Sequence, residues 1–75
     1  MIKWVVVYTS KKDEDVIAYV HSTKQGAVER FSAFFNRGGE EIDGTSLDKC
    51  IYLGGAKFKD FWLYLMPVNE DEGVQ

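Results

Sequence analysis

Cys50 and His21 are the residues in this chain best suited to nucleophilic chemistry, and each is the single residue of its type. A cysteine attacks as the thiolate and needs a base within hydrogen-bond distance, a role that an imidazole can take. One isolated cysteine inside a β-rich stretch is more typical of a small core residue than of a nucleophile. We therefore predict that Cys50 is structural and that the chain has no catalytic residues.

The acidic residues and glycines do not form the pattern of a metal or phosphate site. One Cys, one His and dispersed carboxylates do not provide matched ligands, and the Asp-x-Asp-x-Asp-Gly pattern of a calcium loop is missing. The segment 54–57, Gly-Gly-Ala-Lys, lacks the spacing of a phosphate loop and the Ser or Thr after its lysine. We expect the carboxylates to be exposed, so nothing would raise a carboxyl pKa for acid catalysis. The sequence predicts no enzyme, no metal and no cofactor.

Composition indicates one small globular domain. The chain has 75 residues, 45% of them apolar, and a formal net charge of −3. One cysteine cannot form an internal disulfide, no apolar run approaches the roughly 20 residues that cross a bilayer, and the first residues lack the pattern of a secretory signal. We expect a cytoplasmic protein with no membrane partner, a domain over residues 1–68, and a disordered acidic tail over residues 69–75.

The element that organises the rest of the chain is a helix predicted for residues 23–37. Ser22 and Gln25 have the spacing of a capping box at its start, and Gly38 and Gly39 end it. Its apolar side chains recur at helical spacing and cover an arc of roughly 120°. They are Ala27, Val28, Phe31, Phe34 and Phe35. Three phenylalanines on one face make this helix the centre of the predicted core.

Four β-rich segments flank the helix in two pairs. Residues 2–9 and 16–21 are rich in β-branched and aromatic residues and predict one hairpin, and residues 49–53 and 58–68 predict a second. The predicted order is ββαββ, an α+β fold in which a four-stranded, mainly antiparallel sheet carries one helix on one face.

The stretch 46–53 leaves an alternative open. As a strand, it would continue through a tight turn at Gly54-Gly55 into the last strand. Thr45 and Asp48 also have capping-box spacing, so the same stretch could instead form a two-turn helix ending at the two glycines. We favour the strand, because Ile51 and Tyr52 have high β propensity.

Period-2 alternation divides the sheet residues into two sets, and one helix can cover only one of them. The set assigned to the helix side is mostly aliphatic: Val5, Val7, Val16, Ala18, Val20, Ile51, Leu53, Phe61, Leu63 and Leu65. The set expected on the other side holds both tryptophans and all four tyrosines: Trp4, Val6, Tyr8, Ile17, Tyr19, Tyr52, Trp62, Tyr64 and Met66. Tyr and Trp combine an apolar body with a polar tip, which suits a surface that is wet when free and buried when bound.

The predicted function is protein binding through this aromatic face. We expect a non-catalytic module that occupies the surface of a protein partner, or associates with itself, through six residues: Trp4, Tyr8, Tyr19, Tyr52, Trp62 and Tyr64. Such a small acidic domain with an aromatic surface is similar in style to the accessory proteins with which phages and mobile elements inhibit or regulate host machinery.

Two alternatives to protein binding remain. In a single-stranded nucleic-acid-binding module the strand aromatics would stack on bases, and lysines would have to lie near them. Otherwise the aromatic face is covered by the 38–48 loop or by the tail, and it has no binding role.

Overall fold

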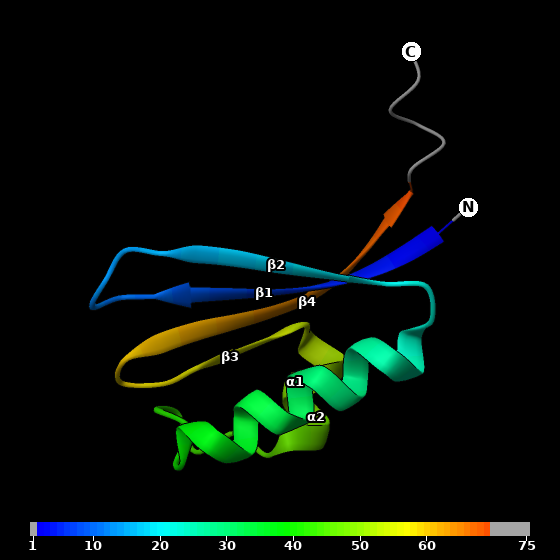
Figure 1. The fold of residues 1–75 in the computed structure, drawn as a ribbon. Helices are drawn as coiled ribbons and strands as arrows, with labels where there is room; N and C mark the ends of the chain where they lie inside the picture. The colour runs from blue at the N-terminus through cyan, green and yellow to red at the C-terminus, as the bar shows by residue number, and fades with distance from the viewer. Residues whose placement is uncertain (1, 70–75) are drawn as a thin grey trace.

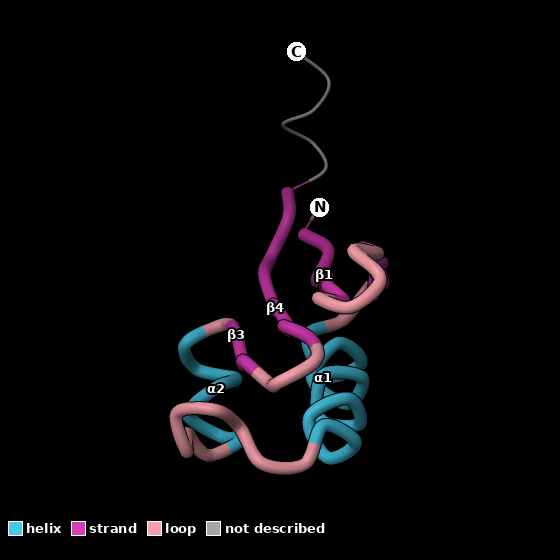
Figure 2. Tube along the Cα trace, turned by 90° about the vertical axis from the view of Figure 1, so that its left-hand side faces the viewer, coloured by secondary structure: helices cyan, strands magenta, loops and turns pink. Residues whose placement is uncertain are grey.

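A four-stranded antiparallel sheet with two helices makes up residues 2–69, which are the residues that the computed structural model describes. The elements in chain order are β1 (Ile2–Ser10), β2 (Val16–His21), α1 (Lys24–Gly38), α2 (Leu47–Leu53), β3 (Gly55–Lys57) and β4 (Phe61–Asn69). The strands lie in the order β2-β1-β4-β3, and both helices lie on the same side of the sheet (Figures 1 and 2). The predicted α+β class is therefore confirmed.

The strand predicted for residues 49–53 is wrong, because this segment is the helix α2. Ser46 caps it by accepting a hydrogen bond from the Lys49 N–H at 3.3 Å. Gly54 ends it in the left-handed conformation at φ 84° and donates its N–H to the carbonyl of Cys50 at 2.8 Å. Good caps at both ends outweigh the β propensity of the residues between them. The element order is thus ββααββ, and the sheet carries two helices instead of one.

Helix α1 forms where the sequence predicts it, with its cap one residue later. The hydroxyl of Thr23, and not that of Ser22, accepts the Gly26 N–H at 3.1 Å. The C-cap is Gly39, at φ 80°. The predicted apolar face of α1 does pack on the sheet, with Ala27 and Phe31 fully buried.

Strand β4 begins and ends later than predicted. Residues 58–61 form a turn, in which the Phe58 N–H donates to the carbonyl of Phe61 at 2.9 Å. The strand continues through Pro67 to Asn69, which lies opposite Ile2 of β1. Asn69 therefore belongs to the sheet, and the remainder of the predicted tail, residues 70–75, lies outside the described residues.

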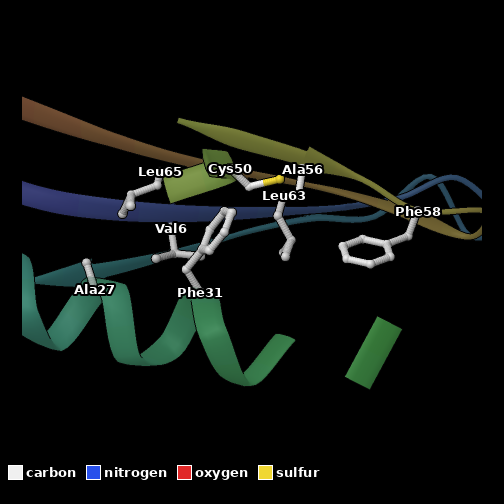
Figure 3. Close-up of a cluster of buried hydrophobic side chains, with 8 residues drawn as sticks. All are labelled: Val6, Ala27, Phe31, Cys50, Ala56, Phe58, Leu63 and Leu65. Atoms are coloured by element: carbon white, nitrogen blue, oxygen red, sulfur yellow. The ribbon is translucent and has the colours of Figure 1, made fainter. Parts of the chain in front are cut away.

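The core lies between the sheet and the two helices. Val6 in β1 stands opposite Tyr19 of β2 and Leu65 of β4, so these three residues share the helix side. The buried apolar side chains gather there (Figure 3): Val6, Ala27, Phe31, Cys50, Ala56, Phe58, Leu63 and Leu65. Cys50 of α2 joins this cluster, so the second helix contributes to the core as well as covering the sheet.

The predicted faces of β1 and β2 are reversed in the structure. Tyr8 lies on the helix side, where its ring centroid is 5.2 Å from that of Phe34 and 5.0 Å from that of Phe61. The valines and alanine predicted to face the helix lie on the other side: Val5, Val7, Val16, Ala18 and Val20. Both faces of these strands are apolar, so alternation alone does not identify the inner one. The choice follows from packing, since aromatic rings fill the space beside the phenylalanines of α1.

Neither helix in residues 2–69 is long and apolar enough to cross a membrane.

Candidate functional site

The six aromatic residues predicted to form one binding patch lie at three separate places. Tyr8 and Tyr19 pack under α1, with the Tyr19 ring 5.6 Å from that of Phe34. Trp4 and Tyr52 line a groove beside α2. Trp62 and Tyr64 lie on the side of the sheet away from the helices, a surface that we call the open face. The prediction of a contiguous aromatic patch is therefore wrong.

The open face is mainly aliphatic, with two aromatic residues on its central strand β4. The register assigns to it Lys3, Val5, Val7, Thr9, Val16, Ala18, Val20, Gly55, Lys57, Trp62, Tyr64, Met66 and Val68. Val16 is 66% exposed and Val20 is 61% exposed. Within residues 2–69 no helix lies on this side of the sheet (Figure 2). Apolar side chains of this face are therefore exposed to solvent within the described part of the chain.

Lysines surround Trp62 at one end of the open face. The Nζ atom of Lys11 lies 5.0 Å from the Trp62 ring centroid, and that of Lys57 lies 5.9 Å from it. The indole N–H of Trp62 is buried and donates no hydrogen bond. Lys3 adds a third cation to the face, which carries no acidic residue. The open face is thus apolar with a basic rim, although the chain as a whole is acidic.

The groove beside α2 has a volume of about 610 Å³. Trp4 forms part of its wall, with the Nζ atom of Lys24 5.2 Å from its ring centroid. Tyr52 is 88% exposed at its rim, beside the exposed Leu53. The sequence predicts Leu53 on the core side of a strand, but Leu53 is exposed because the segment is a helix.

A second groove, of about 420 Å³, runs between α1 and β2. Arg30 crosses it, donating its Nε–H to Nε2 of His21 at 3.0 Å while its guanidinium lies 4.2 Å from the Tyr19 ring centroid. Arg37 lines the same groove and lies over the ring of Phe34, at 5.4 Å. Both arginines are therefore held on aromatic rings along the outer side of α1.

Cys50 and His21 have different hydrogen-bond partners in the structure. Cys50 is in the core, where burial, together with the charges of Glu41 and Asp43, raises the pKa of its thiol. His21 lies at the end of β2, against Arg30. Among the described residues there is also no cluster of His, Cys, Asp and Glu that could hold a metal ion.

Glu41 is a polar residue whose role the sequence did not reveal, because the acids near it were all expected to be exposed. It is only 7% exposed. One carboxylate oxygen accepts the N–H groups of Asp43 at 2.8 Å and Thr45 at 2.9 Å, and the other accepts that of Lys57 at 3.2 Å. The bond from Thr45, with those from Lys57 and Asp43, lowers the pKa of Glu41 against the opposing effect of burial. The carboxylate therefore ties the 39–46 loop to β3.

No family model, curated protein or solved structure matches this chain.

Proposed function

We propose that this chain is a non-catalytic protein-binding module that uses its open face to pack against a partner protein. The observation that supports the proposal is the apolar side of the sheet, which no element of residues 2–69 covers. Soluble monomers rarely expose a contiguous apolar surface of more than a few hundred Å², and larger ones mark interaction sites.

The composition of the open face favours a partner of particular chemistry. Tyr64 lies near its middle on β4 and Trp62 lies nearer one end, and residues of these two types often contribute most of the binding energy of an interface. Lys3, Lys11 and Lys57 surround the apolar part, so a partner with acidic residues around an apolar centre fits best.

A pair of matched substitutions tests this proposal. Tyr64→Ser removes an aromatic side chain from the open face, and Tyr52→Ser removes the same side chain from α2 on the other side of the sheet. With a partner captured from the native host, we expect Tyr64→Ser to raise the Kd about tenfold or more, as at a hot spot. Tyr52→Ser should leave the Kd within about twofold. Equal effects of the two changes would contradict binding through the open face.

Single-stranded nucleic acid is a second candidate ligand, because Lys11 and Lys57 lie beside the aromatic ring of Trp62. Basic side chains next to a stacking platform are the pattern expected for such binding. Titration with a single-stranded oligonucleotide at several salt concentrations separates the two proposals. Affinity that falls steeply with salt and is lost in Trp62→Ala would support nucleic-acid binding, whereas no binding at low salt would eliminate it.

A further inference from the structure

The two edges of the sheet differ in whether their backbone groups have partners. At the outer edge of β3, the Lys57 N–H donates to the Glu41 carboxylate at 3.2 Å, and the Lys57 carbonyl accepts the Ile42 N–H at 2.9 Å. The 39–46 loop thus occupies that edge at Lys57. At the other edge, β2 pairs only with β1, and nothing in residues 2–69 pairs with its outer side.

The hydrogen bond next to the hairpin turn identifies the backbone groups on this free edge. The Ser10 N–H donates to the Asp15 carbonyl at 2.8 Å, so these two residues form a hydrogen-bonded pair. Antiparallel strands alternate bonded and non-bonded pairs, so Ile17, Tyr19 and His21 bond to β1. The N–H and C=O groups of Val16, Ala18 and Val20 therefore point away from the sheet.

The free edge has none of the features that keep sheet edges apart in monomers. Such edges usually carry lysine, proline, a bulge or a very short strand. β2 instead reads Val-Ile-Ala-Tyr-Val-His over six residues and pairs with β1 in an unbroken register. Val16, Ile17 and Val20 are all exposed. This edge has the composition of a strand that pairs with another strand.

We propose that two copies of this chain pair through β2, antiparallel, about a two-fold axis at Ala18. This register places Val16 opposite Val20 of the second copy, and Ala18 opposite Ala18 of the second copy. The outward N–H and C=O groups of all three residues then meet outward groups of the partner, as a hydrogen-bonded ladder requires. The smallest side chain lies on the axis, and the two open faces join into one surface.

The outer side of α1 is complementary to itself about the same axis. Arg30 and Phe34 both contact Tyr19, which is in the middle of β2. Ala33 lies between these two residues of α1 and lines the groove, so it is level with the middle of β2. Glu29 lies four residues before Ala33 in the groove, and Arg37 lies four residues after it.

In the proposed dimer, two antiparallel copies of α1 related by the axis bring Glu29 of each copy level with Arg37 of the other. Within residues 2–69, neither Glu29 nor Arg37 contacts a group of opposite charge in its own chain. A second copy supplies the missing partner for both, which is the charge complementarity that a specific interface needs.

Solution mass and amide exchange of the full chain test the pairing. We expect sedimentation to show a monomer that becomes a dimer as concentration rises. In the dimer, the amides of Val16, Ala18 and Val20 should exchange with solvent at least tenfold more slowly than in the monomer. A chain that stays monomeric at all concentrations up to about 1 mM would have a dimer Kd above that value, which is too weak for a specific interface. This result would overturn the proposal. So would a dimer in which these three amides remain unprotected, which would instead indicate association through the open face.

Substitutions at the edge and on α1 test the two halves of the interface. Ala18→Pro removes one outward N–H, a change that an edge strand tolerates, and should abolish the dimer while far-UV circular dichroism stays unchanged.

Glu29→Arg and Arg37→Glu should each raise the dimer Kd about tenfold. The double variant should return the Kd to within about threefold of the starting value, because the charge pair is restored in reverse.

A matched control separates the edge from the open face. Val20→Lys adds a cation at the edge and should abolish the dimer, whereas Met66→Lys adds one to the open face on β4, away from the edge, and should not. A dimer that survives Ala18→Pro and Val20→Lys would refute pairing through β2 and would leave the proposed role of the open face unaffected.

Discussion

Glu41→Gln is the substitution that most directly tests how the chain holds its loop. The Glu41 carboxylate accepts three backbone N–H groups, from Asp43, Thr45 and Lys57. Glutamine keeps one carbonyl oxygen for the first two, but its amide nitrogen cannot accept the N–H of Lys57. Hydrogen bonds to a charged group contribute about 1.5–3 kcal/mol each, and neutral ones about half of that. We therefore expect a loss of about 3–6 kcal/mol in the free energy of unfolding at pH 7.

The loss should depend on pH in a defined direction. The pKa of Glu41 is lower in the folded chain than the value of about 4.3 of a free glutamate. The carboxylate therefore stabilises the fold fully above that value, and the contribution disappears as pH falls through the folded pKa. The gap between the wild type and Glu41→Gln should be complete at pH 7 and should narrow below about pH 4.

Urea unfolding followed by tryptophan fluorescence measures both effects. Glu40→Gln is the matched control, because Glu40 is the neighbouring carboxylate and is exposed. We expect it to change the free energy of unfolding by less than about 0.5 kcal/mol. Equal losses for the two variants, or a gap for Glu41→Gln that stays constant from pH 7 to pH 3, would refute the assigned role.

Three further changes test the core. Phe31→Ala should cost about 3–5 kcal/mol in urea unfolding, because the ring is fully buried, and an unchanged midpoint would contradict that burial. Gly38→Ala should destabilise by about 1–3 kcal/mol, although alanine usually favours helices, because its Cβ would lie 2.7 Å from ring atoms of both Phe58 and Phe61; a rise in Tm would contradict this packing. Cys50 should react with a thiol reagent only when the chain unfolds, because it is buried and its thiol pKa is raised. Rapid labelling of the native chain would show that Cys50 is accessible.

The sequence predicts those elements of the fold whose signals agree with one another. Helix α1 has a continuous apolar face and two glycines at its end, and β2 has the bounds that its β-branched residues indicate. Helix α2 was missed because its signals conflict. The strand-forming Ile51 and Tyr52 lie between helix caps at Ser46 and Gly54, and the caps are decisive once Cys50 can reach the core.

The candidate surfaces were harder to predict because they depend on register. The pairing of Val6 with Leu65 decides which side chains of β1 lie under the helices, and alternation within one strand does not contain that information. The roles of Glu41 and of the β2 edge depend likewise on which chain segments lie beside them. A carboxylate in a polar loop has the same local pattern whether it is exposed or accepts three backbone bonds.

The closed edge at β3 limits how far copies of this chain can assemble. A sheet with two free edges can add a copy at each end and grow into a fibre. Within residues 2–69, pairing of two β2 strands uses the free edge of β2. The outer strands of the joined sheet are then the two β3 strands, whose Lys57 backbone groups are already bonded to Glu41 and Ile42. The loop bonds to Lys57 therefore oppose addition of a further copy at β3, and they favour a finite dimer over a fibre.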